Sequence, residues 1–184
     1  MKKLSLVCFL LLSCLLMNAK NNPLRLQEGS LTSLKNCGGL ITCKFDFSKT
    51  KSNKKSLKEY IEEDTKMSFE SFKRTEPEML TWFMERWDDD IEEGPKATTS
   101  DDAQFKVDII IKNLTLGSNS GYGAASISGK ALFYKKGENE PFAVVEILKM
   151  NGTMVGAGVP GYIGLKQSFN DLAEYLCDLI YHSK

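Results

Sequence analysis

Three stretches with a two-residue hydrophobic period, close together in the chain, constrain the fold of this protein most. In the first, the apolar residues of Phe105–Ile111 alternate with polar ones, and the pattern changes phase at Lys112-Asn113 as it does at a β-bulge. The second and third stretches cover residues 125–134 and 142–150, and residues 135–139 between them suit a tight hairpin loop. The three stretches predict an antiparallel meander.

Further elements are predicted on both sides of the meander. Alternation over Cys43–Phe47 predicts a strand, and Ser56 with Glu59 has the capping-box spacing of a short helix. Thr75 and Pro77 predict the start of a second helix. The last helix has its apolar face on Leu165, Phe169, Leu172, Ala173, Leu176 and Ile180. The order β-α-α-β-β-β-α predicts an α+β fold, with an antiparallel sheet of about four strands and helices packed on one face.

The amino-terminal residues have the pattern of a secretory signal peptide. Lys2 and Lys3 precede an apolar run, Leu4 to Met17, that is short for a membrane span. Ala19 offers a cleavage site, and Cys14, which ends a lipobox-like Leu-Leu-Ser-Cys, offers lipidation as the alternative.

These patterns divide the chain into three parts. We expect a signal peptide over residues 1–19, a loose lead-in over 20–41 and a single α+β domain over 42–184, exported to the periplasm or held at the outer membrane. Without the two leader lysines, 22 basic residues face 24 acidic ones. This balance argues against nucleic acid as a partner and limits membrane contact to a lipid anchor.

Three cysteines follow the leader. Cys37 and Cys43, in NCGGLITC, are spaced for a small disulfide loop in an oxidising compartment. Cys177 lies among apolar helix positions, where a buried free thiol is the expected state.

The second half of the chain carries a resemblance. The segment FKVDIIIKNLTLGSNSGYGAASISGKALFYKKGENEPFAVVEI, followed by a glycine-rich stretch and an amphipathic helix, resembles uncharacterised exported proteins and lipoproteins of Gram-negative bacteria. Its layout is similar to the TolB amino-terminal domain and to curli-assembly lipoproteins. The resemblance covers about the last 80 residues. It implies an envelope location and a non-catalytic role, and it supplies no catalytic residue.

The stretch GAGVPG, residues 156–161, matches the G-x-G-x-x-G fingerprint of dinucleotide-binding loops. Such a site needs a second parallel strand after the helix, with an acidic residue for the ribose, and none follows in this sequence. Pro160 also removes an amide hydrogen from the loop. We therefore expect no cofactor and interpret the glycines as a structural loop.

The sequence offers little for catalysis or metal binding. His182, the sole histidine, lies near the carboxyl terminus. The acidic run that begins at Asp88 lacks the glycine of a calcium loop and is predicted to be a solvated, frayed helix end. Carboxylate pairs formed by Asp46 or Asp108 with Glu146 keep a hydrolase as the alternative. We expect no catalytic residue and no metal ligand.

Binding or assembly is the predicted function. Trp82 lies off the apolar stripe of its helix and, with Tyr122, Ser126 and Ser128, forms the predicted partner surface, whereas Trp87 is predicted to be buried. The partner is expected to be an envelope protein or a small ligand, and self-association through the small-residue strand is a further alternative.

Overall fold

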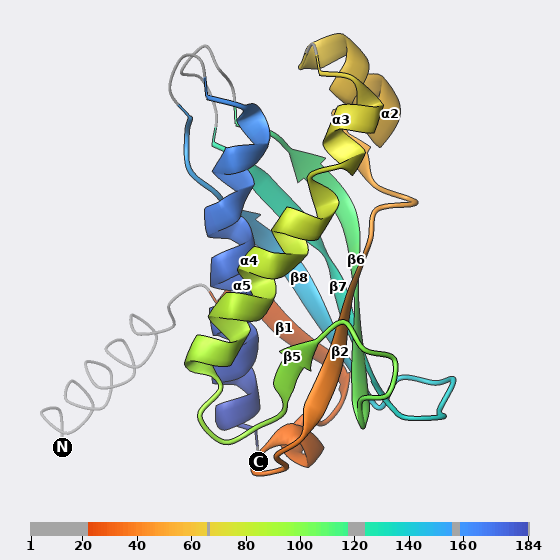
Figure 1. Ribbon diagram of the computed structural model, residues 1–184, viewed down its shortest axis with the longest axis vertical. Coiled ribbons are helices and arrows are strands. Elements are labelled where there is room, and N and C mark those ends of the chain that lie inside the picture. Colours follow the sequence, from red (N-terminus) through yellow and green to blue (C-terminus); the bar gives the residue numbers. More distant parts are fainter. Residues whose placement is uncertain (1–21, 66, 118–123, 156–158, 184) are drawn as a thin grey trace, which may run out of the picture.

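The computed structural model describes residues 22–65, 67–117, 124–155 and 159–183, in which a mixed sheet is covered on one face by two long helices (Figure 1). The strands of this part of the chain are β1 (Leu24–Gly29), β2 (Leu40–Asp46), β3 (Lys51–Ser52), β4 (Lys55–Ser56), β5 (Lys96–Thr98), β6 (Phe105–Thr115), β7 (Ser126–Lys135) and β8 (Ala143–Asn151). The long helices are α4 (Glu76–Asp90) and α5 (Leu165–Tyr181). The shorter elements are η1 (Thr32–Leu34), α2 (Leu57–Glu59), η2 (Tyr60–Asp64), α3 (Phe69–Lys73) and η3 (Gly161–Gly164). The predicted signal peptide, Cys14, Tyr122 and Gly156 to Gly158 lie outside the described residues.

The predicted meander is confirmed. Strand β6 pairs antiparallel with β7, and β7 pairs antiparallel with β8. The register of β6 against β7 shifts between Ile111 and Asn113, where the hydrophobic pattern changes phase. The residues of β7 that face the helices, from Ile127 to Phe133, are buried, and the alternate ones are half-exposed.

The helix signals are confirmed as well. Ser56 and Glu59 form a reciprocal capping box at the start of α2. Helix α4 begins after Thr75 with a proline in its first turn. On α5 the buried residues include the predicted stripe Leu165, Phe169, Leu172, Ala173, Leu176 and Ile180. Each helix thus turns its apolar side to the sheet.

The prediction of an antiparallel sheet of about four strands is wrong in its detail. The sheet has eight strands among the described residues: six follow the order β1-β8-β7-β6-β2-β5, and β3 and β4 form a hairpin attached to β6. Strand β2 pairs parallel with both β6 and β5. The reason is the long connection after β2, because a chain that leaves a strand and returns through helices over the face of the sheet re-enters in the same direction.

The amino-terminal part of the domain is also more ordered than predicted. Residues 24–29, expected to belong to a loose lead-in, form β1, which pairs antiparallel with β8 along one edge of the sheet. Most of β1 is exposed, and its one well-buried residue is Leu24. An edge strand of this kind has too few apolar residues to show a clear two-residue period.

The core lies between the helices and the sheet. Phe45 of β2 contacts Phe83 of α4 and Phe169 of α5, with ring centroids 5.5 Å and 4.9 Å apart. Trp87 is fully buried and donates its indole N–H to the carbonyl oxygen of Pro95 at 2.8 Å. Among the described residues, no helix is long and apolar enough to cross a bilayer.

Candidate functional sites

The sheet face opposite the two long helices carries half-exposed side chains in cross-strand rows. One row runs from Asp46 through Ile110, Lys130 and Glu146 to Arg25, alternating charges around one isoleucine. The alternation within each strand turns these side chains away from α4 and α5. We call this surface of the sheet the open face.

An apolar strip crosses the open face. Leu132 of β7 pairs with Val144 of β8 and Asp108 of β6, and Ile110 follows two residues after Asp108. Ile110 and Leu132 are half-exposed, Val144 is only 6% exposed, and Leu148, which is 45% exposed, lies further along β8 beyond Glu146. Side chains of opposite charge border the strip, as they border the apolar centre of many protein interfaces.

The predicted partner residues fall in different places. Ser126 and Ser128 lie half-exposed on β7, and Ser128 accepts a hydrogen bond from the side-chain amide of Asn113 at 3.0 Å. Trp82, predicted to be exposed, is only 7% exposed because it packs against Tyr162 of η3. The structure therefore does not bring Trp82 to the serines.

The carboxylates considered for a hydrolase do not converge. Asp46 and Glu146 lie in one row but on strands three spacings apart, roughly 14 Å at ordinary strand separation. Asp46 accepts the amide hydrogen of Ser48, whereas Asp108 forms an ion pair with Lys106 at 2.7 Å. Glu146 accepts a hydrogen bond from Gln27 at 2.7 Å. Each of the three carboxylates therefore interacts with its own neighbouring residue and not with the other two.

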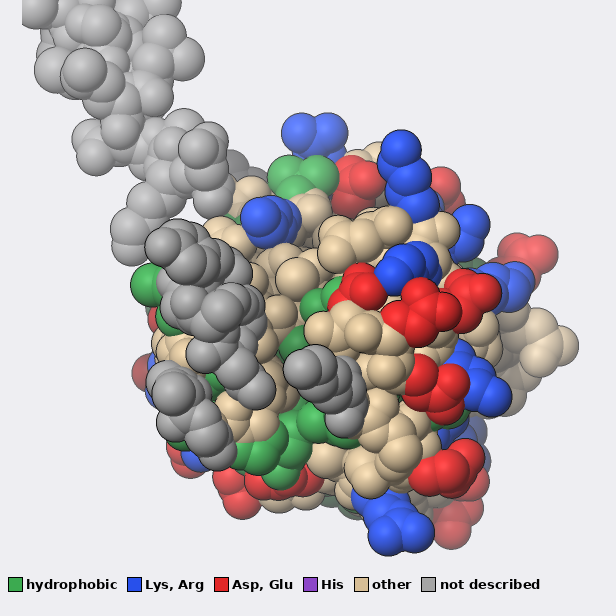
Figure 2. Space-filling model, turned by 90° about the horizontal axis from the view of Figure 1, so that it is seen from above, with side chains coloured by type: hydrophobic (Ala, Val, Ile, Leu, Met, Phe, Trp, Pro, Cys, Tyr) green, Lys and Arg blue, Asp and Glu red, His purple; other side chains and the backbone are tan. Residues whose placement is uncertain are grey.

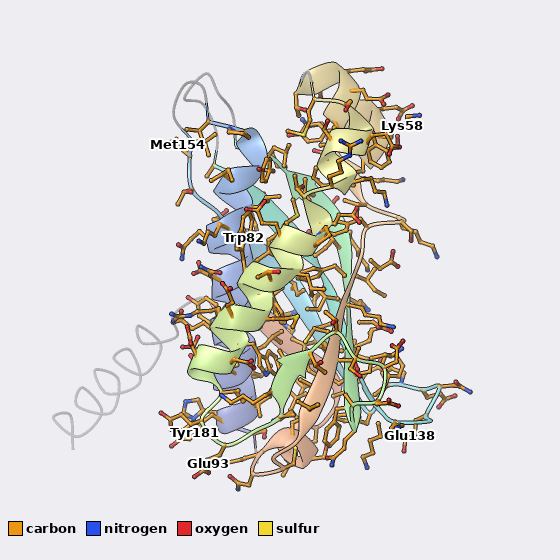
Figure 3. All side chains as sticks on the ribbon, viewed as in Figure 1. Lys58, Trp82, Glu93, Glu138, Met154 and Tyr181 are labelled. Atoms are coloured by element: carbon orange, nitrogen blue, oxygen red, sulfur yellow. The ribbon has the colours of Figure 1, made fainter. Side chains whose placement is uncertain are left out.

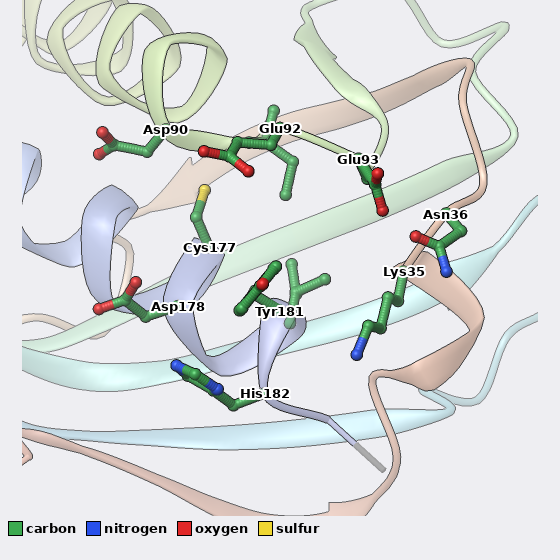
Figure 4. Close-up of a pocket in the computed structure, with 11 residues that line it drawn as sticks. Lys35, Asn36, Asp90, Glu92, Glu93, Cys177, Asp178, Tyr181 and His182 are labelled. Atoms are coloured by element: carbon green, nitrogen blue, oxygen red, sulfur yellow. The ribbon is translucent and has the colours of Figure 1, made fainter.

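A cavity of about 340 Å³ lies where the carboxyl-terminal ends of α4 and α5 meet the loop after η1 (Figure 4). Glu92, Glu93 and Asp178 line it, together with Tyr181 and His182, whose rings meet edge to face. The residues drawn in Figure 4 surround a centre towards which Lys35 extends. The ammonium of Lys35 lies 5.5 Å from the centroid of the Tyr181 ring.

The charge of this cavity is mainly negative. The carboxyl-terminal end of a helix carries the negative end of its dipole, and two such ends meet here. Burial raises the pKa of Asp90, against the attraction of Arg86. Because Glu92, Glu93 and Asp178 have no ion pair among the described residues, the cavity suits a positively charged group.

The acidic end of α4 is better held than its sequence predicts. The ammonium of Lys96, on β5, donates to the carbonyl oxygens of Asp88 at 2.5 Å and Ile91 at 3.3 Å. Asp88 in turn accepts the amide hydrogen of Ala97 at 2.7 Å. A basic residue on the strand just after the helix thus offsets the unfavourable charge of this helix end, and the helix continues to Asp90.

The predicted disulfide is not present in the structure. Cys37, Cys43 and Cys177 are all free, and β2 holds Cys43 within the core while Cys37 lies in the preceding loop. Burial raises the pKa of the Cys43 thiol to about 12 and also raises that of Cys177. Both thiols behave as small apolar groups.

The described part of the glycine-rich loop has a structural role. The amide of Gly117 donates to the carbonyl oxygen of Gly161 at 3.2 Å, and Thr153 donates in the same way to Gly164 at 3.0 Å. A Cβ atom on Gly161 would lie 2.8 Å from the carbonyl oxygen of Gly117. Glycine is therefore required where the start of η3 crosses the end of β6.

The cavity was missed by sequence reasoning, because its walls come from segments more than 50 residues apart. Across the described residues, no group of three or more histidine, cysteine or acidic side chains is placed to hold a metal ion. The other end of the molecule has charged side chains on one side and exposed hydrophobic side chains beside the residues drawn in grey (Figure 2). Met154, which is 64% exposed, lies at this end (Figure 3).

These features define an α+β protein with an open sheet face and a small acidic cavity. No family model and no curated protein matches the sequence. Among solved structures, a PelC dodecamer from Paraburkholderia phytofirmans matches with a TM-score of 0.45 and 5% identity, over 83% of this chain and 95% of that one. A second PelC dodecamer gives 0.39 and 8%, over 86% and 91%. The hypothetical protein CT253 from Chlamydia trachomatis gives 0.35 and 11%, over 77% and 97%. At these scores the similarities carry no inference about activity or partners.

Proposed function

We propose that this protein is exported to the bacterial cell envelope and acts there by binding, with the open face as its binding surface. The observation that carries the proposal is the half-exposed apolar pair Ile110 and Leu132, with the exposed Leu148 further along β8, among rows of alternating charge. An apolar centre with a charged border is the usual composition of a protein interface. The charged leader and apolar run of residues 1–19 support export.

A non-catalytic role is part of the proposal. It is supported by the separate engagement of Asp46, Asp108 and Glu146 on the open face. A carboxylate-dependent hydrolase holds two such groups within about 5 to 10 Å of one substrate bond. The half-exposed serines of β7 instead leave room on the open face for a close-fitting partner.

Site-specific photocrosslinking in the native envelope tests the binding surface. A photoreactive amino acid in place of Leu132 or Leu148 is expected to give a discrete crosslinked product. The same residue in place of Thr81, which is exposed on the outer side of α4, is the matched control and is expected to give none. Equal products from both surfaces, or none from the open face, would contradict the proposal.

Mass spectrometry of the chain recovered from the envelope tests export. A mature chain that begins after Ala19 indicates soluble export, and one that begins with a lipidated Cys14 indicates an anchored lipoprotein. A chain that retains its first residues and remains in the cytoplasm would contradict export.

A further inference from the structure

Two surfaces of opposite charge lie at opposite ends of the molecule. Figure 3 places Lys58 near the end that carries α2 and α3, and places Glu93 and Tyr181 at the other end. The first surface is the hairpin formed by β3 and β4, and the second is the acidic cavity at the ends of α4 and α5. Because they lie far apart in one molecule, they cannot neutralise each other within it.

The hairpin and the residues on either side of it present exposed lysines. Lys49, Lys51, Lys54 and Lys58 are exposed and form no ion pair within the part of the chain that the structure describes. Lys55 differs, because it is held by Asp64 at 2.6 Å and by Glu63 at 3.1 Å. These basic side chains are therefore available for contact with another molecule.

The hairpin is also well fixed in place. Its tip residues Asn53 and Lys54 have φ angles of 49° and 69°, both in the left-handed region.

 
Two successive left-handed residues match the mirror-image turns that close tight hairpins. Lys51 pairs with Asn113 of β6, which ties the hairpin to the main sheet.

The cavity accepts an ammonium group in the structure itself. Lys35 holds its ammonium against the Tyr181 ring, while Glu92, Glu93 and Asp178 keep their charges without an ion pair among the described residues. The cavity is open to solvent along Tyr181, which is 55% exposed. It therefore has the chemistry and the access to receive further lysine side chains.

We infer that the partner of the cavity is a second copy of this chain, whose β3–β4 hairpin places Lys51 and Lys54 against Glu92, Glu93 and Asp178. The charge complementarity of the two surfaces carries this inference. The contact joins different surfaces of the two copies, so copies associate head to tail, and a bound pair still offers one free hairpin and one free cavity. The inference concerns surfaces away from the open face and is tested separately from the proposed function.

A mixing experiment with two charge-reversal variants tests the inference. Sedimentation velocity of the full chain, purified after export, is expected to show association at low salt that is lost at high salt. Lys51→Glu/Lys54→Glu and Glu92→Lys/Glu93→Lys are each expected to weaken association about tenfold or more. Mixed together, they are expected to associate again in equal proportions, because the normal cavity of one accepts the normal hairpin of the other and the two reversed surfaces are complementary as well.

The controls separate this contact from general charge effects. Lys135→Glu/Lys136→Glu makes the same charge change at the end of β7 and in the turn after it. It removes the exposed ion pair of Lys136 with Asp102 but is expected to associate like the unaltered chain. Circular dichroism of each variant checks that it is folded. A chain that stays monomeric at low salt, or two variants that do not complex when mixed, would overturn the inference. Loss of open-face crosslinks with the mixing result intact would overturn only the proposed function.

Discussion

The indole ring of Trp82 stacks on the ring of Tyr162, with the centroids 6.5 Å apart and the planes inclined by 10°. The ammonium of Lys166 lies over the indole ring of Trp82, 5.9 Å from the ring centroid. This contact joins α4 to η3 and the start of α5, and it places an aromatic pair where the sequence predicted an exposed partner residue.

Iodide quenching of tryptophan fluorescence checks this arrangement. Both Trp82 and Trp87 are expected to be protected in the unaltered chain, because Trp82 is 7% exposed and Trp87 is fully buried. Tyr162→Ala removes the stacking ring and is expected to increase quenching, whereas Tyr134→Ala on the open face is expected to leave it unchanged. Strong quenching of the unaltered chain would contradict the structure.

The buried thiols predict a loss of stability at alkaline pH. Burial raises the pKa of Cys43 from 9.0 to about 12, so between these values the unfolded chain releases a proton that the folded chain retains. The free energy of unfolding is therefore expected to fall as pH rises through this range, by up to about 1.4 kcal/mol per pH unit for this thiol. Denaturant titrations of the unaltered chain and of Cys43→Ala measure how the free energy of unfolding of each depends on pH. The contribution of Cys43 to this dependence is expected to vanish below pH 9. Cys37→Ser is the control. An equal pH dependence in Cys43→Ala and the unaltered chain would contradict the prediction.

Arg86 bridges the two long helices, at 2.7 Å from both Asp90 of α4 and Glu174 of α5. Arg86→Met keeps an unbranched apolar stem without the charge and is expected to lower the free energy of unfolding by about 1 kcal/mol, a modest cost because the three side chains are partly exposed. The cost is expected to shrink as acid protonates the two carboxylates, which denaturant titrations at neutral and acidic pH measure. A cost that is the same at both pH values would show that packing, rather than charge, sets the contribution of Arg86.

The close backbone crossing after β8 predicts intolerance of any side chain at Gly152. A Cβ atom there would lie 2.0 Å from the carbonyl oxygen of Gly164. Gly152→Ala is expected to cost about 1 to 3 kcal/mol of stability, as overpacking in a core does. Thermal melts compare it with Gly38→Ala, where nothing lies within 4 Å of the added atom and little change is expected. Equal melting temperatures for the two variants would contradict the close approach of Gly152 to the backbone of Gly164.

The elements that the sequence predicted are those with a long, regular pattern. The alternation along β6, the capping box of Ser56 and the stripe on α5 are each local, so a single segment suffices to reveal them. The parallel pairing of β2 with β6 depends on how the intervening helices cross the sheet, which no local pattern records.

The functional surfaces were harder to predict for the same reason. The cavity combines Lys35, Glu93 and Tyr181 from three distant segments, and their types alone predict only solvated charge. The burial of Trp82 depends on Tyr162, whose position is set by the crossing of η3 over β6. Ser126 and Ser128 were placed on a strand correctly, because their strand has a regular period.

The pairing of β1 with β8 also sets an order of events during synthesis. Arg25 is made early, but its partner Glu146 follows only after about 120 further residues. Until then β1 has no neighbour, while the β6–β7–β8 meander can pair as soon as its own residues are available. The first strand of the chain is therefore among the last to be secured, and a chain interrupted before β8 leaves this strand free to pair with another molecule.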